Sequence, residues 1–532
     1  MSPAHVFIGL FATVISAVPV QAQPQAAGAL PGKPGVTRLA LPRMGEAGAM
    51  DLAAERQLGE LIAQQIYRDP DYLDDPVLGD YLQALWQPLL ASAKASGELS
   101  PELAERFAWE LMLSRDRSIN AFAMPGAYLG VHLGLVAAVG TADELASVLA
   151  HELTHVTQRH ISRLIAKQDQ QAPLVIGAMI LGALAANAAK NTDVAQAVMV
   201  GGQAVAAQAQ LNFSRDMERE ADRIGFGVMT DAGFDGHGFA GMFDRLQQAS
   251  RLNDDGAFPY LRSHPLTGER IADMKARLAL ASAEPPEPQR ATPPNVSAQW
   301  HAFMAARARV LAEPDVRRLQ AWAQEPPTAP ASRYAAALSA HRLKQAPAAL
   351  SLARQLLAQP DLDAQARRAA NLLALEIWLM PGNSMAMGAT ATAAAGADAF
   401  QRRLAELADS ALAASDRASV LMGAQVVLQQ GRPSPVSQRL QVWVTDHPRD
   451  APAWRWLAQA WAAQGQPLRA IRAEAESRMA HLDVDGALDR LRAAREMAQR
   501  GAATDHLEMS IIDARYRQLL QRQRELAAER RP

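Results

Sequence analysis

Helical periodicity organises the first part of the chain that is expected to fold. Apolar residues from Leu52 to Leu82 recur mostly three or four positions apart, and Asp69-Pro70 interrupts them. Residues at that spacing lie on one face of an α-helix, whereas proline lacks the backbone N–H needed to continue one. The pattern therefore predicts two helices, with folding starting near Asp51.

The period changes to that of β-strands between residues 107 and 136. Trp109, Leu111 and Leu113 recur at every second position, as on one face of a half-buried strand. A Pro-Gly turn at residues 125–126 then separates two short segments, 120–124 and 128–132. This pattern predicts a small antiparallel sheet.

A long helix is expected after the sheet. Thr141 and Glu144 have the spacing of a capping box, which marks a helix start. Apolar residues then follow at helical spacing from Leu145 to Ile161, so the helix is predicted to continue through Ile161.

Residues 174–186 form an apolar run that is too short to cross a bilayer, which takes about 20 residues. A buried helix is the simplest interpretation. Because Gly177 and Gly182 interrupt the run, an interfacial helix with peripheral membrane contact and a mobile lid over an active site remain alternatives.

The C-terminal half has the pattern of helical repeats. Trp454, Leu457 and Ala458, followed by Gly465 and Ala470, match the spacing of a tetratricopeptide helix pair, in which large residues pack against small ones. Weaker echoes occur at residues 334–357 and 475–494. We predict three to five degenerate repeats, broken by a loop at residues 383–397, with an unrelated helix bundle as the alternative.

The N-terminus predicts export. Residues 6–20 are apolar, and Val20 and Ala22 occupy the small-residue positions of a signal-peptide cleavage site. Cleavage after about Ala22 would leave a flexible lead-in rich in Ala, Gly and Pro. An uncleaved anchor is the alternative, because no Lys or Arg precedes the run. A periplasmic location is expected.

Composition argues against a nucleic-acid partner and limits the residue types that could bind a metal. The 532 residues include 53 basic and 55 acidic side chains, for a formal charge of -2, so no overall positive field would attract nucleic acid. Because the chain has no cysteine, a metal site would have to use histidine and carboxylate ligands. Stretches rich in Ala, Leu, Arg and Gln favour a mainly α-helical protein.

The expected layout has six parts. These are a signal peptide at 1–22, a lead-in at 23–47, a first folded domain at 48–282, a proline-rich linker at 283–296, helical repeats at 297–515 and a charged tail at 516–532.

The third predicted helix carries the motif His-Glu-Leu-Thr-His at residues 151–155. Side chains four positions apart share a helical face, so His151 and His155 can bind one zinc ion. Glu152 is rotated by about 100°, which places its carboxylate beside the metal, where it can take a proton from bound water. The spacing predicts a zinc-dependent hydrolase.

Another helix, rich in acidic residues, is predicted after the motif at residues 214–222. Glu218 and Asp222 share one face, so Glu218 can complete the ligand set while Asp222 accepts the second N–H of an imidazole. Glu220 is expected to point elsewhere. His160 is about 180° from His151 on the predicted helix, and we expect it on the surface.

The isolated histidines His132 and His237 are expected to be ordinary packed or exposed side chains rather than ligands.

Together these motifs resemble the HtpX and CAAX-prenyl-endopeptidase superfamily of zinc peptidases. The resemblance rests on HExxH at 151–155, ExxxD at 218–222, the segment Asn-Ala-Phe-Ala-Met-Pro-Gly at 120–126, and Ser-His-Pro-Leu-Thr at 263–267 with Arg270. It is strong over residues 50–280. The chain is most similar to the soluble periplasmic, BepA-like branch, which joins such a peptidase to tetratricopeptide repeats.

The resemblance implies a gluzincin-type α+β peptidase domain followed by the α-helical repeats, with one Zn²⁺ per chain. It also implies that Glu152 is the catalytic base, that His151, His155 and Glu218 are the ligands, and that Asp222 supports them.

Two functions remain open. The first is an endopeptidase that cuts misfolded or misassembled envelope proteins, with repeats that dock a partner or substrate. By resemblance, the setting would be the outer-membrane protein assembly machinery and its quality control. The second is a chaperone-like repeat scaffold with a largely silent or self-inhibited metal site. In the first, an extended substrate would add to a strand formed by Asn120, Ala121, Phe122, Ala123 and Met124.

His264 precedes Pro265 and is expected in an extended or turn segment near a cleft. An imidazole arriving at the open position of a catalytic zinc would displace the water and inhibit the enzyme. We hypothesise this regulatory, fourth-ligand role. Substrate binding, transition-state stabilisation and capping of the next helix are the alternatives.

Overall fold

The computed structural model describes residues 50–167, 215–252, 259–283, 296–324, 329–381, 399–499 and 505–529. The chain divides into two units, residues 1–47 and 48–532, and all described residues belong to the second. The predicted signal peptide, the lead-in, the apolar run at 174–186, most of the linker and the loop at 383–397 lie outside the described residues. Within the described ranges, no helix is both long and apolar enough to span a membrane.

Three helices begin the described chain. They are α1 (Leu52–Arg68), α2 (Pro76–Ala95) and α3 (Pro101–Arg106). The side chains of Asp51 and Asp75 accept backbone N–H groups at the starts of α1 and α2, which satisfies donors that have no intrahelical partner. The prediction of two helices separated near Asp69-Pro70 is confirmed.

A four-stranded sheet follows, with the strand order β1-β2-β4-β3. Its strands are β1 (Tyr72–Leu73), β2 (Glu110–Ser114), β3 (Ala121–Met124) and β4 (Tyr128–His132), and the 3₁₀ turn η1 (Pro125–Ala127) joins β3 to β4.

The predicted small sheet is present, but it is mixed rather than antiparallel throughout. The β3–β4 hairpin is antiparallel, and Gly126 in its turn has a φ of 72°. However, β2 pairs in parallel with β4, because β3 lies on the outer edge rather than between them. Alternation along a strand shows which residues share a face but not which strand becomes the neighbour.

The helix predicted from the capping box begins as expected but ends early. It is α5 (Ala142–Thr157), preceded by α4 (Leu133–Ala138), and the Thr141 hydroxyl accepts the Glu144 N–H. The chain then turns at Arg159, which has a φ of 52°. A separate helix, α6 (His160–Lys167), starts there, so the prediction of one helix through Ile161 is wrong.

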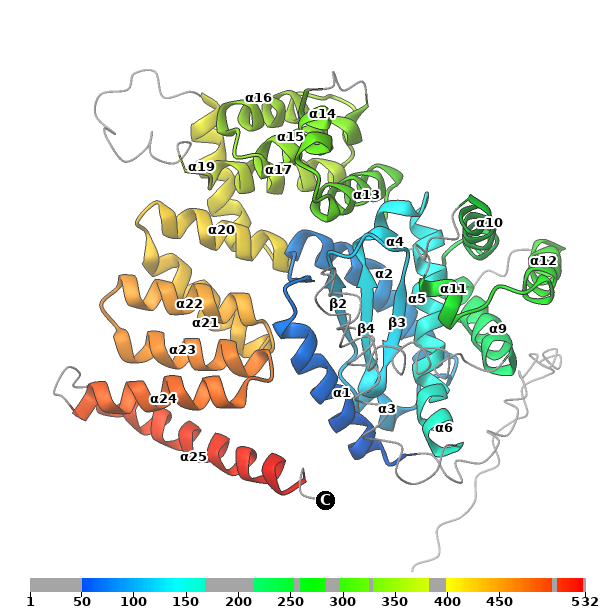
Figure 1. Cartoon of the computed structure of the whole chain (residues 1–532). Helices are drawn as coiled ribbons and strands as arrows, with labels where there is room; N and C mark the ends of the chain where they lie inside the picture. The colour runs from blue at the N-terminus through cyan, green and yellow to red at the C-terminus, as the bar shows by residue number, and fades with distance from the viewer. Residues whose placement is uncertain are drawn as a thin grey trace, which may run out of the picture. The chain divides into compact units, whose positions relative to one another are not determined.

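The remaining helices of the peptidase part are α9 (Arg215–Asp231), α10 (His237–Leu252), α11 (Pro259–Ser263) and α12 (Gly268–Ala283). In Figure 1, α5 lies between β3 and α9. Every side chain from Glu144 to Thr157 is buried. A fully buried central helix gives its functional side chains a rigid frame.

The rest of the described chain is helical, which confirms the expected fold class. Its helices are α13 (Ala298–Ala312), α14 (Val316–Gln324), α15 (Pro330–Arg342), α16 (Ala346–Leu357), α17 (Ala364–Trp378), α19 (Ala399–Ala413), α20 (Arg417–Gln429), α21 (Pro433–Asp446), α22 (Ala451–Ala463), α23 (Pro467–Ala480), α24 (Val484–Gln499) and α25 (His506–Glu529).

The helix pair expected near Trp454 is formed by α22 and α23. Gly465 has a φ of 69° in the turn between them, and Leu457 and Ala470 are buried. Residues 516–529, predicted as a charged tail, form the second half of α25, with Leu519 buried.

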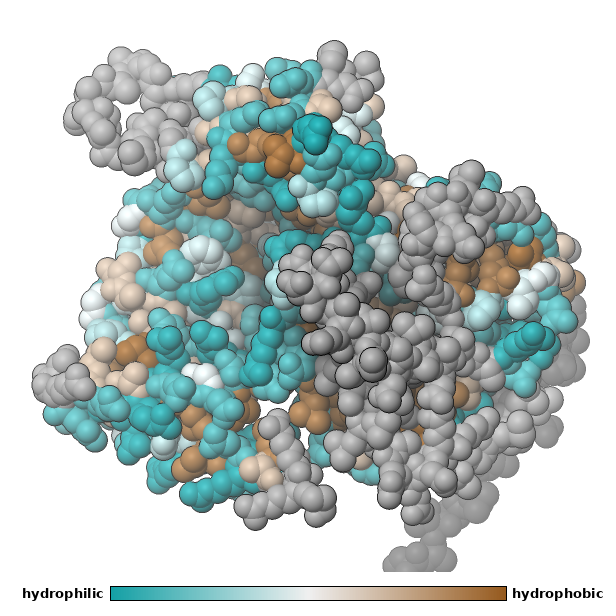
Figure 2. Space-filling model, viewed as in Figure 1, coloured by the Kyte–Doolittle hydropathy of each residue, from teal (hydrophilic) through white to brown (hydrophobic). Residues whose placement is uncertain are grey.

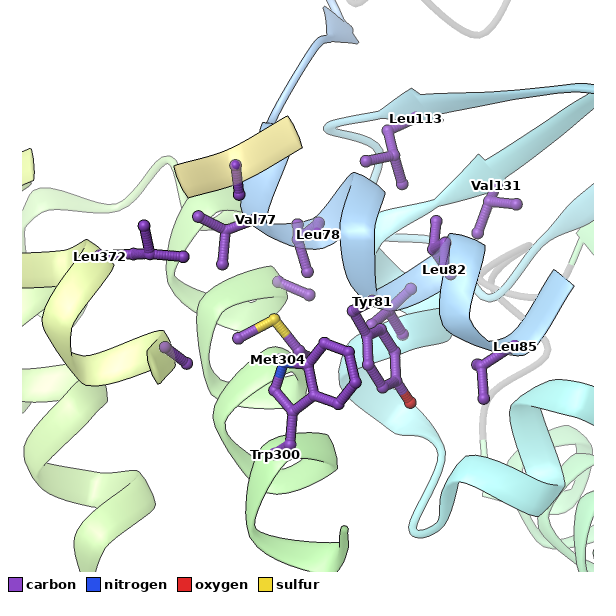
Figure 3. Packing of buried hydrophobic residues seen from close by; sticks show 14 of the residues in the cluster. Val77, Leu78, Tyr81, Leu82, Leu85, Leu113, Val131, Trp300, Met304 and Leu372 are labelled. Carbon is purple, nitrogen blue, oxygen red and sulfur yellow. The ribbon is translucent and has the colours of Figure 1, made fainter. Parts of the chain in front are cut away.

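Apolar packing joins α2 to the C-terminal helices. Figure 3 shows Val77, Leu78 and Tyr81 of α2 beside Trp300 and Met304 of α13. The Tyr81 and Trp300 rings meet edge to face, with centroids 5.3 Å apart. Helices from both halves of the chain therefore share one hydrophobic core.

Buried and partly buried ion pairs reinforce this packing. Arg307 on α13 contacts Asp75 and Glu376, with shortest distances of 2.6 and 2.8 Å. Arg417 on α20 contacts Asp74 at 2.8 Å. The acidic residues just before α2 thus hold arginines from separate C-terminal helices.

The surface in view is less apolar than this core. In Figure 2, hydrophilic residues cover most of the helices between residues 296 and 529, and hydrophobic residues form separate patches. The apolar surface visible there is divided among several elements.

Candidate metal centre

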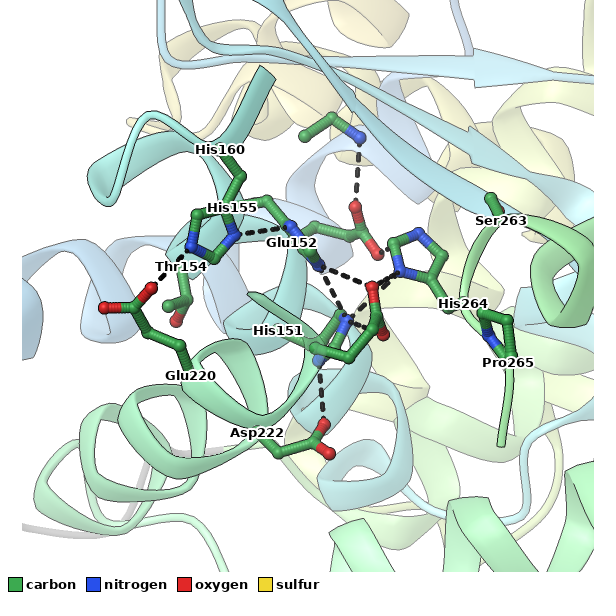
Figure 4. A network of polar contacts seen from close by, with 12 residues as sticks. His151, Glu152, Thr154, His155, His160, Glu220, Asp222, Ser263, His264 and Pro265 are labelled. Carbon is green, nitrogen blue, oxygen red and sulfur yellow. Dashed lines mark hydrogen bonds and ion pairs between the residues drawn. The ribbon is translucent and has the colours of Figure 1, made fainter. Parts of the chain in front are cut away.

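Helix α5 brings the two histidines of the motif together. His151 and His155 lie one turn apart, and their Nε2 atoms are 2.9 Å from each other (Figure 4). Both imidazoles are buried. The turn of an α-helix therefore creates the two-histidine pair expected from the spacing.

Two further side chains close the cluster. Glu218 comes from α9, and His264 follows α11 directly. His264 Nδ1 is 3.0 Å from Glu218 Oε1 and 3.3 Å from His151 Nε2. Glu218 is also 3.5 Å from His151 Nε2 and 3.6 Å from His155 Nε2. One ligand atom from each of the four residues lies within 4.8 Å of the others.

These distances fit a tetrahedral zinc site. Zinc ligands at about 2.0–2.1 Å from the metal lie about 3.3 Å from one another in a tetrahedron. The contacts of 2.9 to 3.6 Å among the four groups are close to that edge length. Three imidazoles and a carboxylate also suit zinc in a chain without cysteine.

The electrostatics of the cluster favour a cation. Burial opposes protonation of His151, but hydrogen bonds with Asp222 and Glu218 outweigh it and raise its pKa to about 9. Burial and the neighbouring His151 lower the pKa of His155 well below its usual range. Burial would raise the pKa of Glu218, yet His264 and His151 lower it far below normal. The carboxylates therefore attract positive charge, as a proton or as a metal ion.

Glu152 lies beside the cluster, as expected. Its Oε2 accepts the backbone N–H of Ala123 at 3.0 Å, whereas its Oε1 is buried without a hydrogen-bond partner in the described part of the chain. That oxygen is 3.5 Å from His264 Nε2. Burial raises the pKa of Glu152 despite the opposing effects of His264 and His151. A carboxylate of this kind is a suitable proton acceptor.

Asp222 supports His151 from outside the cluster. Its Oδ1 is 3.0 Å from His151 Nδ1. Arg270 forms two hydrogen bonds with Asp222, at 2.6 and 2.8 Å, and its Nη1 lies 2.9 Å from Glu218. The arginine thus orients two carboxylates at once, a role that sequence reasoning did not assign to it.

His160 is not on the surface, so that prediction is wrong. The turn at Arg159 brings the His160 ring back toward α5, where it is fully buried. Its Nδ1 is 2.9 Å from His155 Nδ1, and its Nε2 is 3.0 Å from Glu220 Oε2. Glu220, expected to point elsewhere, faces this pair. The error came from treating residues 142–161 as one continuous helix.

The environment of Glu220 keeps it ionised. Its hydrogen bond with His160 is the largest influence and outweighs partial burial, and the pKa of Glu220 falls to about 2. Arg163 Nη1 donates a further hydrogen bond at 3.1 Å.

Tyr260 is a second neighbour that sequence reasoning missed. Its ring stacks on His264 with centroids 4.7 Å apart, and it is buried. No motif marks it, because its place depends on how α11 packs. It would hold the His264 ring in one orientation.

The isolated histidines are not members of the cluster, whereas the predicted substrate-binding strand borders it. His132 is buried and is 2.8 Å from the Ser118 hydroxyl, whereas His237 is exposed beside Asp235. The Asn120 side-chain oxygen is buried and has no hydrogen-bond partner among the described residues. Residues 121–124 form the edge strand β3 next to Glu152.

Comparison with known proteins also indicates a peptidase. Residues 80–278 match the model of Peptidase family M48. A Yersinia pestis beta-barrel assembly-enhancing protease is 26% identical over 96% of this chain and 97% of its own length. The Escherichia coli protein of the same name is 27% identical over 91% of this chain and 92% of its length.

A Vibrio cholerae protein whose name places it with these proteases is 34% identical, and the match spans 51% of this chain and 52% of that protein. The chain thus covers about half of this relative but nearly all of the other two.

Proposed function

We propose that this chain, a metallopeptidase whose residues 80–278 form a domain of Peptidase family M48, is a zinc-dependent endopeptidase acting on misfolded or misassembled envelope proteins. The observation that carries the proposal is the buried cluster of His151, His155 and Glu218 with Glu152 directly beside it. This arrangement supports metal-assisted hydrolysis of a peptide bond.

A zinc ion held there would polarise the scissile carbonyl and acidify a water molecule. Glu152 Oε1, buried and without a hydrogen-bond partner among the described residues, can accept the proton of that water and pass it to the leaving amine. Asp222 keeps the His151 Nε2 lone pair directed into the cluster by accepting a hydrogen bond from Nδ1.

The edge strand β3 offers a place for an extended substrate. It pairs with β4 on one side and lies at the end of the strand order. A peptide could add to its other side as a further strand, with its backbone passing the Glu152 carboxylate near Ala123. Recognition through the backbone would suit unfolded chains of many sequences.

The biological setting is inferred from the relatives. Two proteins named beta-barrel assembly-enhancing proteases match over nearly the whole chain, including the helices after residue 296. We infer that this protein works in the periplasm in outer-membrane protein assembly and quality control. Its C-terminal helices, as tetratricopeptide-like repeats, would dock the substrate or the assembly machinery.

Glu218→Ala tests the proposed ligand set. The wild-type protein should retain about one zinc per chain after dialysis, and a strong chelator should abolish casein cleavage. Glu218→Ala should retain much less zinc, because the three remaining imidazoles, those of His151, His155 and His264, include no negatively charged ligand. Metal analysis and casein cleavage measure both effects.

The exposed substitution Glu269→Gln is the control and should keep full zinc content and activity. If Glu218→Ala binds zinc with wild-type stoichiometry and affinity, the third ligand lies elsewhere. If casein cleavage is insensitive to the chelator, the proposed activity is wrong.

A self-inhibited scaffold is the second candidate, and the position of His264 favours it. Its Nδ1 occupies the fourth corner of the ligand cluster, where a substrate carbonyl or water would bind. The stacked Tyr260 ring holds it there. In this state the metal would have four protein ligands and no open position.

His264→Ala should therefore raise casein cleavage while zinc stays bound by the other three ligands. If the closed state is favoured by about 1.4 kcal/mol, only about a tenth of the molecules are open and removal of the imidazole gives about a tenfold increase. Initial cleavage rates and zinc content are measured together, with His237→Ala at an exposed histidine as the control. Loss of turnover with zinc retained would instead assign His264 to catalysis.

A further inference from the structure

A chain of polar contacts runs from the buried cluster to Glu220 on α9 and Arg163 on α6, which are both partly exposed. His155 Nδ1 lies 2.9 Å from His160 Nδ1, and His160 Nε2 lies 3.0 Å from Glu220 Oε2 (Figure 4). Arg163 Nη1 lies 3.1 Å from the same Glu220 oxygen. In Figure 4, the His155 ring, the His160 ring and the Glu220 carboxylate follow one another in space, on the side of His155 that faces away from His264.

These contacts allow one arrangement of protons when His155 binds a metal through Nε2. Its Nδ1 must then carry the hydrogen and donate, because a neutral imidazole has one N–H. His160 Nδ1 must accept that hydrogen bond, which places the His160 hydrogen on Nε2. Glu220 accepts from Nε2 and is itself held by Arg163.

His151, the other histidine of the motif, has a comparable set of partners. His151 Nδ1 donates to Asp222, and Arg270 fixes Asp222 with two hydrogen bonds. In both cases an imidazole is followed by an acidic side chain and then by an arginine. The difference is that His155 reaches its carboxylate through a second imidazole.

The backbone around Arg159 creates the position of His160. Because α5 stops at Thr157 and Arg159 adopts a φ of 52°, His160 faces back toward His155. The Arg159 side chain holds this turn through Glu55, with hydrogen bonds of 2.9 and 3.1 Å. A straight helix would have pointed residue 160 away from His155.

We propose that His160 is a positioning residue that fixes the tautomer and orientation of His155, with Glu220 and Arg163 fixing His160 in turn. The inference rests on the proposed zinc site and extends it to residues that do not touch the metal. Partners of metal-bound histidines typically change metal affinity by about 10–100-fold when they are removed.

Two substitutions at residue 160 separate hydrogen bonding from packing. His160→Phe keeps a ring of similar shape but removes the acceptor, whereas His160→Asn loses volume but keeps an acceptor oxygen near the position of Nδ1. We expect the zinc Kd to rise by about 10–100-fold in His160→Phe and by clearly less in His160→Asn. A packing role predicts the reverse order.

Zinc affinity is measured on the full chain by competition with a chromophoric chelator. The visible spectrum of the Co²⁺-substituted protein reports the ligand geometry and should change in His160→Phe. His237→Phe is the matched control, because that histidine is 70% exposed, and it should leave both readouts unchanged.

If His160→Phe fails to fold, Glu220→Ala decides the question at a half-exposed position. It should weaken zinc binding by about tenfold, because the His160 ring loses the acceptor that fixes its tautomer. Wild-type affinity in Glu220→Ala, or in a folded His160→Phe, overturns the proposal. Failure of the wild type to bind zinc would instead reject the metal site itself.

Discussion

Glu152→Gln is expected to slow casein hydrolysis by about 10²–10⁴-fold, the usual contribution of a general base. The amide cannot take a proton from water, but its oxygen can still accept the Ala123 N–H, so the local structure should survive. His151 and His155 are unchanged. Zinc content should therefore stay at the wild-type value while kcat falls.

The measurement pairs initial cleavage rates with metal analysis and thermal unfolding. Glu269→Gln makes the same chemical change at an exposed site and should leave all three readouts at wild-type values. Full activity in Glu152→Gln would remove this side chain from the mechanism. Loss of zinc in the same variant would show that its role is structural.

Arg307→Ala is expected to destabilise the folded chain by about 3–5 kcal/mol, the usual cost of breaking a buried ion pair. The guanidinium is 2% exposed and hydrogen bonds to Asp75, Glu376 and the Tyr334 hydroxyl. Its removal would leave Asp75, which also caps α2, as a buried carboxylate without its cation. The junction between α2 and the C-terminal helices should weaken first.

Urea unfolding followed by tryptophan fluorescence measures this effect. Arg309→Ala is the matched control, because it removes an exposed arginine from the same helix and should change stability by less than about 0.5 kcal/mol. Equal unfolding midpoints for the two variants would contradict a stabilising role for Arg307.

Local patterns in the sequence were enough for much of the candidate centre. The spacing of His151 and His155, and of Glu218 and Asp222, follows from the helical repeat, and the structure brings all four side chains together. The Thr141 cap is likewise a contact between near neighbours and forms as expected. The spacing within each pair and the cap depend on a few residues in one element, whereas the meeting of α5 with α9 is a tertiary contact.

Contacts between distant segments were not predictable in the same way. The parallel pairing of β2 with β4 depends on where β3 lies in the sheet, which alternation does not encode. The ion pair of Arg307 with Asp75 joins residues 232 positions apart, and nothing in either local sequence marks the partner.

The sequence by itself determined the helical spacing within the His151–His155 and Glu218–Asp222 pairs, and hence a candidate metal site with a carboxylate beside it. Only the tertiary structure decided that α5 ends before His160 and that Tyr260 stacks on His264. It also decided that His160 contacts both His155 and Glu220. The physical reason is that a helical repeat fixes positions only within an unbroken helix. A single left-handed residue, Arg159, redirects the chain, and the packing of other helices determines what it meets.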